Sequence, residues 1–354
     1  MMPNSKKVLG ICASSRKNGN SAIILNELLR PVREAGHEVE VLNLGTLKIF
    51  SCTGCLGCIH SGSRCVRNDD LELVKQKIEE ADAIALASPC YYLSTPSPLR
   101  AIMERSANWA IEKLANSTQK KYGVAVSVAG GNPIESSMQR MNASLFLGLY
   151  NCEIVGQFTI GHAFNKGEVL LVPSKLRLVR ELGENLLQSL AENRCIRSSI
   201  NECENQLICP NCLADAFQIY KDGTMVCPVC GGKLENGKSG NRAGFNRFSV
   251  EGAREHKRHI LDNAIGGMLA GDEINQRLQA YWSSNTIPQD DYPIDRDLSG
   301  IVDSLNWDDE ALKTLQASVP VALQELIKKV VTKKALQEGV SQITKKEFQQ
   351  CWRF

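Results

Sequence analysis

The sequence has no run of about 18 apolar residues, which is the length that a membrane-spanning helix needs, so we expect no membrane span. The N-terminal stretch MMPNSKKVLGICASS contains no long apolar run ending in a cleavage site, and this predicts no signal peptide. Excess charge is also missing, because 41 Lys and Arg stand against 39 Asp and Glu. The balance predicts no bulk attraction to nucleic acid or to an anionic membrane. We expect a cytoplasmic protein.

Cysteine, by contrast, is abundant, with 14 in 354 residues. Disulfides are disfavoured in a reducing compartment, so these thiols need another explanation. Eight of them fall into two clusters, described below. The other six are scattered, as core or incidental thiols usually are: Cys12, Cys90, Cys152, Cys195, Cys203 and Cys351.

The first half of the chain alternates between short apolar stretches and helical patterns. The stretches are rich in Val and Ile, as buried parallel strands are, and begin at Lys7, His37, Ala81, Tyr122 and Glu153. The helical patterns cover Ser21–Glu34, Asp69–Glu80, Pro98–Ala115, Ile134–Leu149 and Ser174–Arg194. Five repeats of strand and helix predict an α/β fold with a five-stranded, doubly wound parallel sheet. Ligands of such sheets bind at the carboxyl ends of the strands.

The composition divides the chain into four parts. We expect the sheet domain over residues 1–200 and a small cysteine-rich module over 203–235. A Gly/Asn linker then opens a helical linker region over 236–300, with helical patterns at Ser249–Ile265 and Asp272–Trp282. Residues 301–354 read as a separate helical unit.

The loop after the first strand, ASSRKNGNSAIIL, has the residues of an anion site. Ser14, Asn20 and Ser21 supply short polar side chains, Arg16 supplies a cation, and the following helix points its amide dipoles at the loop. The loop lacks both G-x-G-x-x-G and G-K-[ST], so it is neither a dinucleotide loop nor a nucleoside triphosphate loop. It fits a phosphate monoester, and the alternative is an ordinary capped helix start.

Two further loops, SPCYYLSTP after the third strand and AGGNP after the fourth, complete a pattern. Together the three loops resemble those of the flavodoxin-like NADPH-dependent FMN reductases. This resemblance implies a flavodoxin-like fold and an FMN site. The phosphate would bind Ser14, Arg16, Asn20 and Ser21; the turn along the flavin would be Ser88, Pro89, Cys90, Tyr91 and Tyr92; the third loop would be Gly130, Gly131 and Asn132. We interpret Cys90 as a small apolar neighbour of the ring rather than a redox thiol.

The first cysteine cluster, Cys52, Cys55, Cys58 and Cys65, follows the second strand and hence lies at the same sheet edge. Its compact spacing allows one loop to wrap an iron–sulfur cubane, whereas a zinc site, the alternative, usually draws on two knuckles. The segment resembles that of the iron–sulfur flavoproteins of anaerobic microbes. The resemblance covers about Lys6 to Arg194 and implies that the four cysteines ligate a 4Fe–4S cluster. It also implies a homo-oligomer.

The second cluster, Cys209, Cys212, Cys227 and Cys230, forms two C-P-x-C knuckles. This spacing predicts a tetrahedral thiolate site in a zinc-ribbon or rubredoxin-like module. We expect zinc, as a staple for a segment too small for its own core, with a single iron as the alternative. Residues 209–235 carry a net charge of −1, from two Lys against three acidic residues, so we expect no nucleic-acid partner.

The C-terminal segment resembles the small helical C-terminal domain of the B subunit of light-independent protochlorophyllide reductase. The matching positions are Trp307, Ala311, Leu315, Pro320, Ala335, Gly339, Ile343 and Thr344. Apolar spacing fits a compact helical unit, with Thr344 capping the last helix. Leu323 and Lys333 depart from the family pattern, so the resemblance implies the fold rather than tetrapyrrole chemistry.

Taken together, these patterns predict an FMN-dependent oxidoreductase. A cluster carries one electron at a time and FMN carries one or two, so the pair can exchange electrons between ferredoxin or NAD(P)H and an acceptor that the sequence does not identify. The alternative is a non-enzymatic redox sensor or adaptor that uses the ribbon and the helical tail to recognise a partner. The patterns name no catalytic proton-transfer residue.

Overall fold

The structure is a computed structural model of the chain. It describes residues 5–60, 64–117, 119–198, 207–235, 238–239, 246–269, 276–277, 280, 283, 305–318, 324, 327–328, 331–332, 335, 340 and 342–351. The chain divides into two compact units. The first unit is Met1–Cys52 with Cys65–Lys257, and the second is Thr53–Arg64 with Arg258–Phe354.

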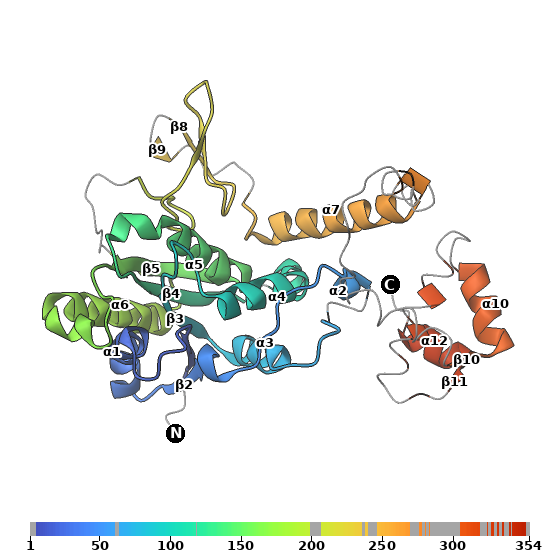
Figure 1. The fold of residues 1–354 in the computed structure, drawn as a ribbon, viewed down its shortest axis with the longest axis horizontal. Coiled ribbons are helices and arrows are strands. Elements are labelled where there is room, and N and C mark those ends of the chain that lie inside the picture. Colours follow the sequence, from blue (N-terminus) through green and yellow to red (C-terminus); the bar gives the residue numbers. More distant parts are fainter. Residues whose placement is uncertain are drawn as a thin grey trace. The chain divides into compact units, whose positions relative to one another are not determined.

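A five-stranded parallel sheet forms the centre of the first unit, in the order β2-β1-β3-β4-β5 (Figure 1). The strands are β1 (Lys7–Cys12), β2 (Glu38–Asn43), β3 (Ala83–Pro89), β4 (Lys121–Val128) and β5 (Cys152–Ile160). All seven residues of β3 are buried, as expected for a central parallel strand covered on both faces. The predicted doubly wound, flavodoxin-like sheet is therefore confirmed.

Helices α1 (Asn20–Glu34) and α6 (Pro173–Glu192) cover one face of this sheet. Their apolar residues, among them Leu28 and Leu182, are fully buried in one core with strand residues such as Val124. The two helices approach closely, because a Cβ at Gly183 would lie 2.1 Å from the carbonyl oxygen of Leu28. Glycine at this position therefore allows α6 to pack directly on α1.

The opposite face carries α3 (Leu71–Glu80), α4 (Ser97–Asn116) and α5 (Ser137–Leu149) (Figure 1). The strand residues that alternate with the first core, such as Leu9 and Ile84, are 0% exposed. Short 3-10 turns lie in the connections: η1 (Leu44–Thr46), η2 (Pro133–Ser136) and η3 (Glu168–Leu171). The helix after each strand thus returns the chain to the amino edge, and the loops gather at the carboxyl edge.

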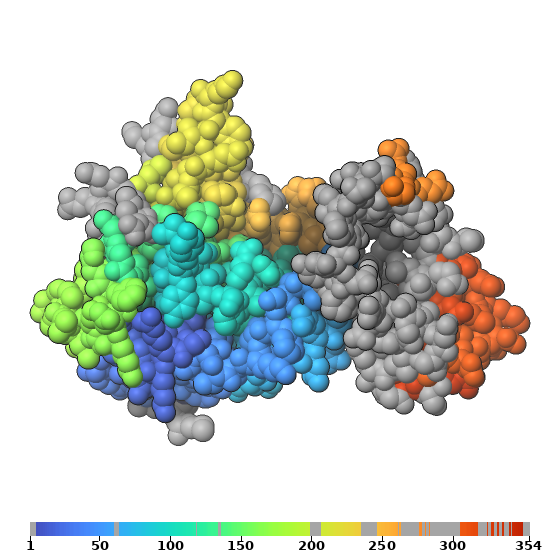
Figure 2. All heavy atoms as spheres, in the orientation of Figure 1, coloured from blue at the N-terminus to red at the C-terminus, as the bar shows by residue number. Residues whose placement is uncertain are grey.

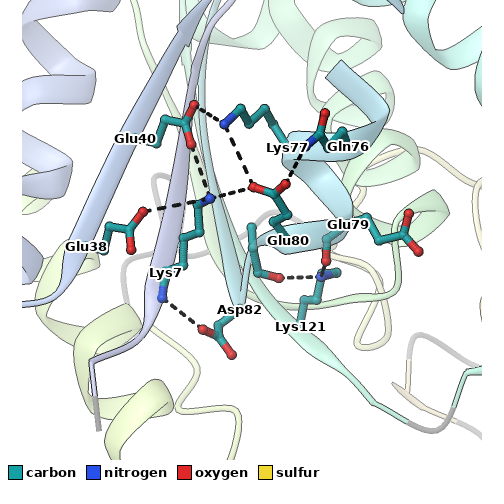
Figure 3. Close-up of polar contacts among 10 residues, drawn as sticks. Lys7, Glu38, Glu40, Gln76, Lys77, Glu79, Glu80, Asp82 and Lys121 are labelled. Carbon is teal, nitrogen blue, oxygen red and sulfur yellow. Dashed lines mark hydrogen bonds and ion pairs between the residues drawn. The ribbon is translucent and has the colours of Figure 1, made fainter. Parts of the chain in front are cut away.

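An ion-pair network holds the amino edge of the sheet, away from those loops (Figure 3). The ammonium of Lys7 lies 2.6 Å from a carboxylate oxygen of Glu80 and 3.4 Å from one of Glu40, and Lys77 lies 2.9 Å from Glu40. The hydrogen bond from Lys7 lowers the pKa of Glu80. Ion pairs at a protein surface contribute little to stability, and this network lies away from the loops at the carboxyl edge.

The cysteine-rich module projects from the sheet domain in yellow (Figure 2). Its antiparallel sheet has the order β6-β7-β8-β9, formed by β6 (Gln218–Ile219), β7 (Met225–Val226), β8 (Lys233–Glu235) and β9 (Lys238–Ser239). The stretch that we interpreted as a Gly/Asn linker therefore supplies a strand, because β9 pairs with β8. Helix α7 (Val250–Leu269) follows and extends beyond the predicted end at Ile265.

The C-terminal segment of the second unit combines helices with a two-stranded parallel pair. Strands β10 (Asn306–Trp307) and β11 (Gln342–Ile343) pair in register, next to α10 (Asp309–Ser318) and α12 (Lys345–Cys351). Several matching positions form the core of this segment, among them Ala311, Leu315, Ala335 and Ile343. The hydroxyl of Thr344 donates to Glu347 at the start of α12. Pro320, Gly339 and most of the expected helix 272–282 lie outside the described residues, and the likeness to the protochlorophyllide reductase domain stays a prediction.

Candidate functional site

The three loops predicted to bind FMN meet at the carboxyl edge of the sheet. The backbone N–H of Ala13 donates to Ala87 O at 2.9 Å, which joins the ends of β1 and β3. The N–H of Cys90 donates to Val128 O at 2.7 Å, which joins β3 to β4. Adjacent parallel strands therefore present all three loops side by side, as the order β1-β3-β4 requires.

The first loop leads into α1 with an open helix start. Gly19 occupies the N-cap in extended conformation, with φ −79° and ψ −179°, and no side chain caps the helix among the described residues. Free N–H groups and the positive end of the helix dipole therefore face the loop. Ser14 and Ser21 are 3% and 2% exposed. This arrangement fits an anion better than the alternative of a self-capped helix start.

Arg16 and Asn20 connect the first loop to the loop after β5. Arg16 Nη1 donates to Phe164 O at 2.8 Å. The side-chain amide of Asn20 donates to Ala163 O at 3.0 Å and to Asn165 O at 2.8 Å, and its oxygen accepts the N–H of Gly167 at 2.8 Å. In this structure Asn20 thus holds the fifth loop, so a phosphate contact through its amide stays a prediction.

The turn after β3 is strained. Tyr91 and Ser94 exchange backbone hydrogen bonds of 2.9 and 3.1 Å around Tyr92 and Leu93. Both central residues have positive φ, 47° and 69°. A two-residue turn with this geometry normally contains Asn or Gly, because side chains with a Cβ are disfavoured there. The phenol of Tyr92 is 99% exposed, so packing does not explain the strain. Such strain is common at ligand sites.

The third loop lies against the fifth. His162 N–H donates to Gly131 O at 2.9 Å, and a Cβ at Gly130 would lie 2.8 Å from the ring of Phe164. Phe164 itself is 67% exposed and stands at the same edge. The loop 161–167 is not among the site residues predicted from the sequence. The only signal was its position after the fifth strand, since none of its residues forms a recognisable motif.

The four-cysteine loop divides between the two units. Cys52 and Cys65 belong to the first unit, whereas Cys55 and Cys58 belong to the second, where α2 (Gly57–His60) lies. Cys52 and Cys55 are exposed, and Cys58 and Cys65 are half-buried. These exposures leave the sulfurs accessible to a metal cluster, and ligation by all four stays a prediction.

A buried ion pair stands where this loop leaves the first unit. Arg105 and Asp69 are 0% exposed at their side chains, and Arg105 Nη2 donates to Asp69 Oδ1 at 3.0 Å. Burial raises the pKa of Asp69, but the hydrogen bonds from Arg105, Phe50 and Leu71 outweigh it and lower that pKa overall. Arg105 Nε also donates to the Sγ of Cys65 at 3.3 Å.

The second cysteine set forms a compact tetrathiol centre. The Sγ atoms of Cys209 and Cys230 are 3.5 Å apart, those of Cys212 and Cys227 are 3.6 Å apart, and all four lie within 4.8 Å of one another. A tetrahedral ion with metal–sulfur bonds of about 2.3 Å needs sulfur separations of about 3.8 Å. These four sulfurs are therefore close enough together to hold a single metal ion.

Matching backbone geometry supports both knuckles of this centre. Leu213 N–H donates to Cys209 O at 2.9 Å, and Gly231 N–H donates to Cys227 O at 2.8 Å. Leu213 and Gly231 each follow the second cysteine of their knuckle and have positive φ, 59° and 81°. In addition, Gly232 N–H donates to the Sγ of Cys230 at 3.3 Å. The repeated geometry is that of two metal-binding knuckles, and the predicted metal-binding module is present.

Buried polar contacts attach this module to β5, the edge strand of the sheet. Gln157 Nε2 in β5 donates to Leu213 O at 2.5 Å. Asp215 accepts a hydrogen bond of 3.2 Å from Ser137 and lies 3.3 Å from Arg140, both on α5. Asp215 is therefore three residues from Cys212 and touches the helix that follows the Gly130–Asn132 loop. A cavity of about 580 Å³ lies between the module and the amino end of β5, lined in part by Arg197 and Cys195.

Comparisons with known proteins agree with this fold. Residues 6–165 match the NADPH-dependent FMN reductase family. The chain is 35% identical over 125 residues to an iron–sulfur flavoprotein of Archaeoglobus fulgidus, covering 35% of this chain and 55% of that protein. It is 32% identical over 151 residues to one of Methanocaldococcus jannaschii, covering 42% of this chain and 76% of the relative. A solved flavone reductase superposes with a TM-score of 0.60 at 19% identity, over 80% of this chain and all of that one.

The chain therefore belongs to the iron–sulfur flavoproteins, within the flavodoxin-like NADPH-dependent FMN reductase group. Membership of this group supports FMN as a cofactor. The chain spans only about half of the Archaeoglobus relative. The residues that match the family model, 6–165, include neither the ribbon nor the C-terminal segment. No helix in the described part of the chain is long and apolar enough to cross a membrane.

Proposed function

We propose that this protein is an oxidoreductase that uses FMN and a 4Fe–4S cluster to pass electrons between a donor, ferredoxin or NAD(P)H, and a separate acceptor. The observation that carries the proposal is the convergence of three polar loops on one sheet edge, with an uncapped helix start and a strained turn beside them. Family membership adds the flavin and the cluster chemistry.

The residues at this edge fit FMN. Ser14, Arg16 and Ser21 would hold the phosphate at the start of α1, with Asn20 shaping the loop, and Ser88–Tyr92 and Gly130–Asn132 would border the ring. A Cβ at Gly45 would lie 2.5 Å from Ser15 Cα, so η1 packs against the phosphate loop with no room for a side chain. The bound flavin would supply one- and two-electron transfer. The chain would orient it and keep water from its ring.

The four-cysteine loop would hold the cluster. Thiolates are the ligands that iron–sulfur clusters use, and Gly54, with φ +66°, gives the loop a tight turn between the first two cysteines. The cluster would exchange single electrons with the flavin, which explains why the two sites lie after neighbouring strands of one sheet. We further propose a homo-oligomer, on the likeness to the family alone.

The tetrathiol centre would hold zinc. Its four sulfurs are at most 3% exposed, so the site is closed and has no open position for substrate. A closed tetrathiolate on a segment with little apolar core is typical of a structural zinc. A single iron has the same ligand geometry and would add a redox centre, so metal analysis decides between the two.

Anaerobic purification with analysis of flavin, iron, sulfide and zinc tests these assignments. Cys58→Ser should abolish iron and sulfide but leave FMN bound, because the two sites use different loops. Cys195→Ser, a half-buried thiol outside both cysteine sets, is the matched control and should retain both cofactors. Reduction by NADH, NADPH or reduced ferredoxin identifies the donor. Unchanged iron in Cys58→Ser would refute the cluster assignment, and wild-type protein without flavin would refute the FMN assignment.

A further inference from the structure

Arg105 is a fully buried cation, and its hydrogen bonds to described residues all lie where the four-cysteine loop begins and ends. It is on α4, and its side chain is 0% exposed. A guanidinium in this environment is costly unless its N–H groups find acceptors. Asp69 takes two of them in a bidentate pair, through Nη1 and Nη2.

The remaining contacts of Arg105 reach both ends of the loop. Nη1 donates to Phe50 O at 3.0 Å, two residues before Cys52, and Nε donates to the Sγ of Cys65 at 3.3 Å. Asp69 in turn accepts the N–H of Phe50 at 2.7 Å. The ion pair therefore ties together the chain segments on which the first and last cysteines of the loop lie.

A purely structural role, holding the two chain segments together, explains the ion pair and the Phe50 contacts. It does not explain the hydrogen bond to the sulfur of Cys65. A neutral thiol is a weak acceptor, whereas a thiolate or a cluster ligand is a strong one. Buried N–H donors normally have good acceptors, and the Nε of Arg105 has a cysteine sulfur. The environment is thus arranged for a negatively charged sulfur at Cys65.

We propose that Arg105 is a positioning residue for the cluster, which fixes Cys65 as a ligand and raises the cluster's reduction potential through its Nε–H···Sγ bond. The reason is that a cationic N–H donor stabilises the sulfur more strongly once the cluster has gained an electron. This inference rests on the proposed 4Fe–4S function. Asp69 has the opposite effect on the potential, because its carboxylate partly neutralises the guanidinium next to the cluster ligand.

Two variants of the full-length, anaerobically purified protein test the proposal. Arg105→Lys keeps the charge but loses the planar fork, so one ammonium has to serve Asp69 and the sulfur in turn. Asp69→Asn keeps the volume and removes the negative charge. Arg100→Lys is the control, since Arg100 lies on the same helix but is exposed and binds Glu104. Measurements are iron, sulfide and flavin per chain, and an EPR-monitored redox titration of the cluster.

We expect Arg105→Lys to lower the cluster potential by about 59 mV, a tenfold change in the ratio of oxidised to reduced cluster for one electron. Asp69→Asn should raise it, and Arg100→Lys should leave it unchanged. A purely structural staple predicts no opposite shifts. Loss of iron from folded, flavin-loaded Arg105→Lys would support the positioning role. The cluster potential of Asp69→Asn would then test whether the charge of the pair affects the cluster.

Several results would overturn the inference. If Arg105→Lys binds the full complement of iron and its cluster potential is unchanged, the bond to sulfur does not determine that potential. If the potential shifts in the same direction in both variants, the ion pair has only a structural role. If Arg105→Lys does not fold, the absence of a rise in Asp69→Asn has the same consequence. A wild-type protein without iron and sulfide would instead refute the proposed cluster itself, so the two failures are distinguishable.

Discussion

Loss of the tetrathiol metal should unfold the ribbon while the five-stranded sheet stays folded. The change is Cys227→Ser, which removes one of four sulfurs whose mutual separations are within 4.8 Å. Apart from its cysteines, the ribbon buries only three apolar side chains to 5% exposure or less among its described residues, those of Ala214, Val229 and Leu234. Full burial of a Val or Leu side chain contributes about 1.5–3 kcal/mol.

This apolar contribution is too small to fold the segment. Ordering the backbone costs roughly 1–2 kcal/mol per residue, so even ten residues outweigh the buried side chains. Structural zinc in small thiolate modules contributes about 10–16 kcal/mol, which makes the metal the largest stabilising contribution to this segment. Without the metal, we therefore expect residues 209–235 to exchange their backbone amides freely. The core between α1, α6 and the sheet contains no ribbon residue and should keep its protection.

The assay is amide hydrogen exchange with metal analysis, on wild type and Cys227→Ser. Cys12→Ser is the control, because Cys12 is a buried cysteine of the sheet core outside the metal set. Aerobic handling should leave about one zinc per wild-type chain and remove the oxygen-sensitive iron and sulfide. If the ribbon amides of the wild type are protected from exchange although no metal is bound, the reasoning is refuted. A red iron centre that bleaches reversibly would show that the bound metal is iron rather than zinc. Faster amide exchange in α5 of Cys227→Ser would further show that the contacts of Asp215 with α5 depend on the metal.

Three further predictions concern single residues of the sheet domain. Arg16→Ala should weaken FMN binding by about 10- to 150-fold in equilibrium dialysis, because it removes one charge-assisted contact worth about 1.5–3 kcal/mol. Arg33→Ala, at the far end of α1, should leave FMN binding unchanged. Equal flavin affinity in the two variants would exclude a phosphate contact by Arg16. Leu93→Gly should stabilise the apoprotein by about 1 kcal/mol in urea unfolding, because it relieves a side chain held at φ 69°, and a loss of stability would contradict the strain. Burial raises the pKa of Cys152 from 9.0 to about 12, so the folded state keeps a proton that the unfolded state loses. This group should then leave the free energy of unfolding unaffected below pH 9 and lower it by up to about 1.4 kcal/mol per pH unit from pH 9 to 12. Urea unfolding at each pH measures this slope, and Cys152→Ala should reduce it.

The sheet was predictable because each of its elements has a local signal. Strands such as β3 are continuous apolar runs, and the intervening helices carry the 3.6-residue period, so their order determines the fold class. The predicted helix starts and ends differ from the observed ones by a few residues, as for α3, predicted from Asp69 and observed from Leu71. The metal module was predictable for a similar reason, because the spacing of its cysteines reflects the geometry of one knuckle.

Contacts between distant segments have no such signal. We interpreted Asn20 as a phosphate ligand from its place in the first loop, and this stays a prediction. Nothing in the sequence indicates that its amide bonds to carbonyls 143 and 145 residues further along the chain. The same is true of β9, where a Gly- and Asn-rich stretch suggests a linker but its pairing with β8 makes it a strand. In both cases the residue type is compatible with either outcome, and the tertiary partner decides.

Arg105 shows why this limit matters most at functional sites. In the stretch MERSANW it is one charged residue on a helix, where the default expectation is a solvent-exposed side chain. Its burial follows from Asp69, which stands 36 residues earlier, and its bond to Cys65 follows from the path of the loop between them. Ligands that belong to one loop can be predicted from their spacing in the sequence. The groups that act on the charge of those ligands belong to other helices and strands, so no spacing reveals them. The residues that hold a cofactor are therefore easier to predict than those that tune it.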